Sequence, residues 1–246
     1  MYDPKGNSKD KGSAAVRFEE ALPPPHLRSV VHRYLHLSTT APLSDDYRFH
    51  ALPDACTYLV LDQQQPAIAG VARLQASAKE LNLGRTFHFV NIRLLPGTWQ
   101  GARDAVTPGL IDTPYTGDLP LQVLNASLAG LPFPDQQALL TPFIDGLVAQ
   151  GLLIPNPLVE RIFTHMDDIH TVADMADIAG LSPRQLQRVL KDTTGFAPHN
   201  FLKILRLQQS LLGEPSLSYA DQSHFIHAFK KATGYTPGKF AAKFDV

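Results

Sequence analysis

Residues 186–198 read LQRVLKDTTGFAP and residues 225–237 read FIHAFKKATGYTP, so one pattern occurs twice with an offset of 39 residues. Four residue types coincide and the apolar positions keep register. The matched pairs are Lys191 and Lys230, Thr194 and Thr233, Gly195 and Gly234, Pro198 and Pro237, together with the apolar pairs Leu186 and Phe225, Leu190 and Phe229, Phe196 and Tyr235. A repeat of this kind indicates one structural unit built twice.

Each copy predicts an amphipathic helix that ends at a glycine, followed by a proline that opens the next helix. Before the first copy, residues 172–178 predict a short helix with an apolar side. A tight turn over residues 179–183 follows, in which Ser182 can cap the next helix and Pro183 can begin it. This is the spacing of a helix-turn-helix motif.

The second helix of such a motif enters the DNA major groove with its outward side chains. Between Pro183 and Thr194 four polar side chains are predicted to face outward, namely Arg184, Gln187, Arg188 and Lys191. Arginine and glutamine suit contacts with base edges, and lysine suits phosphate. By spacing alone, a solvated helix face is the favoured interpretation of this set. The duplicated unit favours nucleic-acid contact.

The C-terminal segment, roughly residues 158–244, resembles the paired helix-turn-helix domain of AraC-type (AraC/XylS) transcription regulators. The most specific match is the string from Asp221 to Phe225, followed by Phe229-Lys230-Lys231, Gly234 and Thr236-Pro237. The resemblance implies two recognition helices, joined by a long helix from Pro198 to about Leu212, in successive segments of the major groove. It also implies DNA contacts from the second helix, at Gln222, Ser223, His224, His227 and Lys230.

Three features depart from that pattern. Residues 211–217 read LLGEPSL where the second motif needs a bracing helix, and Gly213 and Pro215 would break one. His227 stands where relatives usually carry arginine. Residues 157–246 hold ten lysine and arginine residues against nine acidic residues, a weak positive balance for a phosphate-binding domain. We therefore expect a regulator that reads double-stranded DNA mainly through the first motif. The alternative is a degenerate relative that acts as a protein-interaction module or anti-regulator without specific DNA binding.

The N-terminal half shows short apolar runs of strand length at residues 57–61, 68–74, 79–83 and 87–95, which predict a small, mostly antiparallel β-domain. Residues 26–37 have the spacing of a short helix, with a strand as the other interpretation. Residues 96–134 predict loops and short helices. Residues 139–148 predict a helix with Thr141 and Pro142 at its start.

The segment Pro155-Asn156-Pro157 is the predicted domain boundary, because a helix cannot run through it. The expected fold class is an α+β N-terminal domain, mostly antiparallel β, followed by an all-α paired helix-turn-helix domain. The predicted divisions are a disordered lead-in over residues 1–13, a sensing or dimerisation domain over 14–155, and an AraC-type DNA-binding domain over 156–246.

The N-terminal half also resembles, more weakly, a sensor domain found in some of these regulators. The match lies in Leu52-Pro53-Asp54-Ala55-Cys56 and in Ile92-Arg93-Leu94-Leu95-Pro96-Gly97, with Ala55 in place of a glycine. The resemblance implies a small-molecule effector or a protein partner for this half. A homodimer is expected, because one weakly basic motif makes few DNA contacts.

Composition sets further bounds. The chain of 246 residues has a formal net charge of −1 and one cysteine, Cys56, which excludes an intrachain disulfide. No signal peptide and no run of 18 apolar residues are present, so we expect a cytoplasmic protein without membrane contact.

Candidate chemical groups are few, and we expect neither an enzyme nor a bound metal or cofactor. His32 and His36 are four apart and can be interpreted as metal ligands or, preferably, as surface or interface histidines. His50 and His88 can line a pocket or be ordinary hydrogen-bonded histidines. Asp54 and Cys56 suggest packing more than nucleophilic chemistry. Sequence motifs typical of hydrolases, phosphate-binding loops and zinc proteases are absent.

Overall fold

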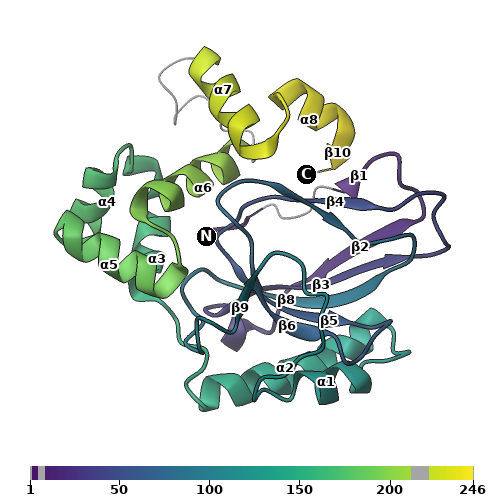
Figure 1. Ribbon diagram of the computed structural model, residues 1–246. Coiled ribbons are helices and arrows are strands. Elements are labelled where there is room, and N and C mark those ends of the chain that lie inside the picture. The colour runs from purple at the N-terminus through teal and green to yellow at the C-terminus, as the bar shows by residue number, and fades with distance from the viewer. Residues whose placement is uncertain (1, 5–8, 212–221, 246) are drawn as a thin grey trace.

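The computed structural model describes residues 2–4, 9–211 and 222–245, and places a β-rich N-terminal half beside a helical C-terminal half (Figure 1). The predicted fold class is confirmed. The largest sheet has six strands in the order β2-β3-β8-β5-β6-β9, and every neighbouring pair is antiparallel except β6 and β9. The bounds are β2 Val16–Ala21, β3 Val31–Thr39, β5 Thr57–Asp62, β6 Ala69–Arg73, β8 His88–Leu94 and β9 Val106–Pro108.

The six-stranded sheet is covered on both faces. One face packs on helices α1 (Leu121–Ser127) and α2 (Phe133–Ala149), with Val90, Ile92 and Leu94 of β8 in that core. The residues between them, Asn91 and Arg93, line a cavity on the other face, because successive side chains of a strand point to opposite faces of the sheet. A two-stranded sheet of β4 (Arg48–Ala51) and β7 (Lys79–Asn82) contributes to the wall of that cavity.

Two predictions about secondary structure were wrong. Residues 26–37 form a 3-10 helix at Pro25–Leu27 and then strand β3, because this strand is buried on both faces and its burial repeats about every three residues. Helix α2 begins at Phe133, ahead of the expected Thr141, and contains Pro142 in its interior. Pro142 is exposed, so the backbone carbonyl that loses its intrahelical partner can bond water.

The lead-in also differs from the expected disorder where it is described. Tyr2 is 6% exposed and its ring stacks on Phe163 at 4.2 Å. Strand β1 (Lys9–Asp10) pairs antiparallel with β10 (Phe244–Asp245), which joins the two ends of the chain. Apolar burial of Tyr2 and backbone pairing of β1 supply the order that the polar composition did not predict.

The C-terminal half begins at α3, where Asn156 caps the helix by accepting a hydrogen bond from the Val159 backbone. Its elements are α3 Pro157–Thr164, a 3-10 turn at Met166–Asp168, α4 Val172–Ala179, α5 Pro183–Thr194, α6 Pro198–Leu211, α7 Gln222–Thr233, α8 Pro237–Lys243 and β10. Buried residues of α3 to α6 form one apolar core. Phe229 of α7 and Phe240 of α8 belong to another core, which also contains Leu52 of the N-terminal half.

Candidate nucleic-acid interface

Helices α4 and α5 form the predicted helix-turn-helix, and both ends of the turn are capped. Gly180 ends α4 with a φ of 67°, the left-handed conformation that glycine adopts without strain. Ser182 begins α5: its side chain accepts from the Gln185 backbone, and its backbone donates to the Gln185 side chain. Thr171 and Asp174 make the same reciprocal arrangement at the start of α4. These caps fix the direction of α5 relative to its brace.

The two faces of α5 divide as the sequence predicted. Leu186 and Leu190 are fully buried, at 0% exposure, against the core that holds Met175 and Ala176 of α4. The four candidate DNA contacts are exposed at positions i, i+3, i+4 and i+7 of one helix face, namely Arg184, Gln187, Arg188 and Lys191. The structure thus brings these four side chains together on one exposed helix face.

The second unit repeats the backbone geometry of the first. Gly195 and Gly234 have φ angles of 80° and 82°. Thr194 donates its hydroxyl to the Leu190 carbonyl at 2.7 Å, and Thr233 donates to the Phe229 carbonyl at 2.9 Å. Helices α5 and α7 span equivalent residues at the offset of 39, as do the starts of α6 and α8. The repeat inferred from sequence is therefore a repeat in structure.

The candidate contacts of the second unit are only partly described. Ser223, His227 and Lys230 are exposed on α7. The side chains of Gln222 and His224 lie outside the described residues. The proposed loss of a bracing helix at residues 211–217 also lies outside them, except for Leu211, which ends α6 as expected.

The two units differ in what they pack against. The aromatic cluster of the second unit meets the N-terminal half: the imidazole of His50 stacks on Phe244 at 4.9 Å and lies edge-on to Tyr235. The Ala78 backbone donates to the Ala232 carbonyl at 2.8 Å. At the first unit, Arg103 forms an exposed ion pair with Asp192 at 3.1 Å, and Arg73 approaches Gly195. Sequence reasoning missed these contacts between the halves.

The two motifs of the N-terminal half lie at the junction with the helices, which explains their residue types. Ala55 has a φ of 61°, a conformation that favours glycine, and it packs among the core residues of the first unit. Gly97 has a φ of 77°, and a Cβ atom there would lie 2.6 Å from the Asn156 amide. Gln208 of α6 donates to the Pro53 carbonyl at 2.8 Å.

Two acidic groups buried near this junction have raised pKa values. Burial raises the pKa of the Asp54 carboxyl and raises the pKa of the Cys56 thiol well above its usual value. The Tyr58 hydroxyl donates to Asp54, and the Cys56 backbone donates to Asp54 at 2.9 Å. These contacts fit the packing interpretation of the Asp54 and Cys56 pair.

The structure also places the four histidines that the sequence offered as metal-binding or pocket residues. His32 and His36 lie on β3, so the helical spacing that suggested a metal site does not exist. His32 is 5% exposed and contacts Asp3 at 2.8 Å, while His36 contacts His88 at 2.9 Å. Burial lowers the pKa of His32 to about 3. Neither His50 nor His88 belongs to the residues lining the cavity of the N-terminal half.

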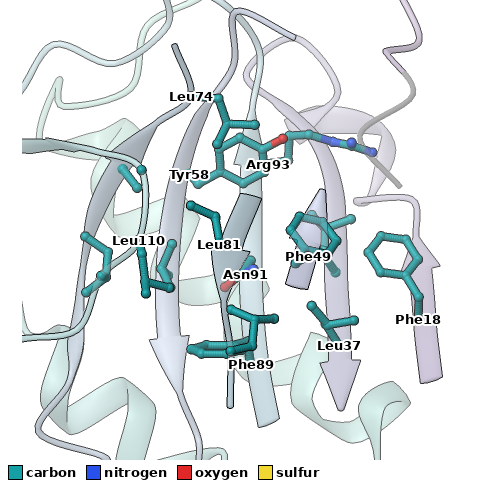
Figure 2. Close-up of a pocket in the computed structure, with 16 residues that line it drawn as sticks. Phe18, Leu37, Phe49, Tyr58, Leu74, Leu81, Phe89, Asn91, Arg93 and Leu110 are labelled. Atoms are coloured by element: carbon teal, nitrogen blue, oxygen red, sulfur yellow. The ribbon is translucent and has the colours of Figure 1, made fainter. Parts of the chain in front are cut away.

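That cavity, between the six-stranded sheet and the β4–β7 sheet, is the main candidate ligand site of the N-terminal half (Figure 2). It measures about 90 Å³ and its walls are mostly apolar. Figure 2 shows aromatic and leucine side chains around it, with Asn91 in the middle and Arg93 beside Tyr58 at one end.

Other kinds of site receive no support from the described chain. Across residues 2–4, 9–211 and 222–245, no three histidine, cysteine, aspartate or glutamate side chains gather as a metal-binding group. Among the helices described, none combines the length and the apolar character needed to cross a membrane.

Comparisons with known proteins find a family model and a transcription regulator that are similar to parts of this chain. A family model described as a domain of unknown function (DUF6597) matches residues 19–105. The HTH-type transcriptional regulator MtrA of Neisseria gonorrhoeae is 28% identical over 94 residues, which is 34% of this chain. The chain covers 31% of the length of that protein.

Solved structures of ToxT from Vibrio cholerae are also similar. Apo ToxT shares 11% identity with a TM-score of 0.41, and covers 94% of this chain and 97% of its own. A ToxT structure at 1.65 Å shares 10% identity with a TM-score of 0.41, over 92% of this chain and 97% of its own.

Proposed function

We propose that this chain, which resembles the AraC-type regulators, is a sequence-specific DNA-binding transcription regulator. In this proposal α5 enters the major groove, with α4 bracing it on the DNA backbone. Arg184, Gln187 and Arg188 contact base edges, and Lys191 contacts phosphate. The observation that carries the proposal is the capped α4–α5 turn, which presents these four side chains together on one exposed helix face.

The second unit has a smaller part in the proposal. Its exposed candidates are Ser223, His227 and Lys230, which carry less fixed positive charge than the first set. Its aromatic residues pack on the N-terminal half, so α7 is held by residues far from the first motif. We assign α7 supplementary contacts, with Gln222 and His224 completing the same helix face in the sequence.

We assign sensing and dimerisation to residues 14–155, DNA binding to 156–246, and no enzymatic role to either. The support for sensing is the apolar cavity and its place: β4 lines it through Phe49 and carries His50 against Phe244 of the second unit. A ligand that displaced β4 would therefore displace the second unit. A homodimer in the cytoplasm would give two copies of the first motif the affinity that one lacks.

The test is binding of the purified chain to fluorescent genomic DNA fragments, including its own upstream region, at several salt concentrations. Arg188→Ala should weaken binding to the selected fragment by about fivefold to 150-fold, because an arginine contact with a base edge contributes roughly 1–3 kcal/mol. Arg17→Ala is the matched control, since Arg17 is exposed on β2 and its loss changes the net charge equally.

The outcomes separate the two candidate functions. Fragment-selective binding that Arg188→Ala loses and Arg17→Ala keeps supports the regulator. Equal losses of affinity in both variants would mean that DNA binding depends on the overall charge of the protein and not on a specific contact of Arg188. The absence of binding down to about 50 mM salt, where non-specific phosphate contacts act strongly, would overturn the proposal in favour of a protein-interaction module.

A further inference from the structure

The cavity of the N-terminal half has apolar walls from two sheets that do not fill the space between them. Leu35 and Leu37 of β3 and Phe89 of β8 line one side, and Phe49 of β4 and Leu81 of β7 line the other (Figure 2). Packed interiors hold few voids larger than a water molecule. A space of about 90 Å³ in such surroundings is therefore a site for an apolar ligand.

Polar atoms without partners lie in the wall of this apolar space. Within the described part of the chain, Asn91 Oδ1 is buried and accepts no hydrogen bond, and Arg93 Nε and Nη1 are buried and donate none. The Arg93 side chain is 1% exposed, and its remaining nitrogen, Nη2, donates to Glu20 at 2.6 Å. Buried polar groups in folded proteins are nearly always hydrogen-bonded, so these atoms indicate a missing partner.

Asn91 and Arg93 require opposite hydrogen-bonding groups from that partner. Asn91 Oδ1 needs a donor and Arg93 needs an acceptor, and both line the cavity from alternate positions of one strand. A hydroxyl group both donates and accepts. A carboxylate only accepts, would leave Asn91 unsatisfied, and would add negative charge near Glu20 and Asp54, which already act on Arg93.

We propose that this cavity binds a small alcohol of about two or three carbon atoms, whose hydroxyl donates to Asn91 Oδ1 and lies toward Arg93. The size follows from the volume: an apolar cavity of roughly 150 Å³ accommodates benzene, this one measures about 90 Å³, and an alcohol of four carbon atoms is already as bulky as benzene. The inference rests on the proposed sensing function of the N-terminal half and names the ligand class that this half would sense.

The experiment uses the full chain without DNA, so its result does not depend on whether the chain binds DNA. Binding of 2-propanol and of acetone is measured by NMR chemical-shift titration. The two probes have the same number of non-hydrogen atoms, but the ketone has no hydroxyl to donate. We expect 2-propanol to bind about fivefold tighter, the value of one ordinary hydrogen bond, and acetate to bind more weakly than 2-propanol.

Two variants locate the site. Asn91→Leu removes the unpartnered acceptor and keeps the side-chain volume, so it should fold and should bind both probes within a factor of about two of each other. Ala72→Val fills part of the cavity from β6, where a β-branched residue suits the strand, and should weaken both probes. The inference is overturned by acetone binding as tightly as 2-propanol, by a preference that survives Asn91→Leu, or by the absence of saturable binding.

Discussion

The two repeat units have nearly the same backbone and different neighbours. In the first unit, Leu190 is buried in a core made by α3 to α6 together with Tyr2 and Ala55 of the N-terminal half. In the second, the equivalent Phe229 is buried with Leu52 of the N-terminal half. The repeated sequence determines the helix, the left-handed glycine and the next helix start. What each unit packs against depends on residues outside the repeat.

The two units also differ in how they are attached to the rest of the molecule. The first unit stands on its own brace, α4, and presents a face of two arginines, a glutamine and a lysine. The second unit joins the N-terminal half through the Ala78–Ala232 hydrogen bond and the β1–β10 pair. We infer that the first unit is built for reading and that the second is where the state of the N-terminal half is transmitted.

The largest expected effect is the loss of stability when a buried side chain is removed from the core of either unit. Phe229→Ala should lower the free energy of unfolding by about 3–5 kcal/mol and Leu190→Ala by about 2–5 kcal/mol, because each leaves a cavity. Only Phe229→Ala should speed exchange of the Ala78 amide hydrogen, which donates to the second unit. Urea unfolding and hydrogen exchange measure the two effects. Ile226→Ala, on the exposed side of α7, is the control and should change stability by less than about 0.5 kcal/mol.

Acid should act on the second unit before the first. Burial lowers the pKa of His50, which is held against the second unit, while the Thr233 backbone and Glu80 oppose that shift and Lys243 adds to it. The folded state therefore binds a proton at His50 less readily than the unfolded state does. The contribution of His50 to the free energy of unfolding is fully present above the ordinary histidine pKa of about 6.5, and it falls as the pH drops below that value.

The expected loss is at most about 1.4 kcal/mol per pH unit for this one group. Hydrogen exchange of α7 and α8 between pH 7 and pH 5 measures it. His50→Phe keeps a ring against Phe244 and should flatten this dependence in the second unit. An equal dependence in wild type and variant would assign the effect to other histidines, such as His32.

Sequence reasoning succeeded where structure is local. The helix ends at Gly195 and Gly234 were predicted because glycine adopts the left-handed conformation without strain. Strand β8 was predicted because residues 87–95 form an apolar run of strand length. The exposed set on α5 followed from helical spacing alone, before any packing was known.

Prediction failed where burial had to be known first. Strand β3 is buried on both faces, so its apolar residues do not alternate with polar ones. Their spacing instead matched that of one helix face. The docking of the second unit joins residues such as His50 and Phe244, which lie far apart in sequence and belong to no shared pattern. A signal did exist in the C-terminal aromatic residues, Tyr235, Phe240 and Phe244, which exceed what two short helices need for their own core.

Substitution of two equivalent lysines, one in each unit, should change the salt dependence of DNA binding to different extents. Lys191→Ala should reduce the slope of log affinity against log salt by about 0.9, the value of one released phosphate contact. Lys230→Ala, at the matching position of the second unit, should reduce it by less than half of that. Titration of a selected DNA fragment at several salt concentrations measures both slopes. Equal reductions would show that both units contact phosphate alike and would remove the functional difference between them.

The smallest expected effect concerns the loop that touches both units. Leu52 packs with the second unit and Ala55 with the first, and Ala55 holds a φ of 61° that an alanine adopts only with strain. Ala55→Gly relieves a cost of about 1–2 kcal/mol and increases the backbone entropy of the unfolded chain, which takes back roughly 0.5–1 kcal/mol. A net gain of up to about 1.5 kcal/mol in the free energy of unfolding should remain. Ala176→Gly, inside α4, is the matched control and should lose about 1 kcal/mol. A loss at Ala55 would mean that its methyl group stabilises the junction by more than the strain costs, because it packs among the core residues of the first unit. The loop would then be part of the core of the first unit.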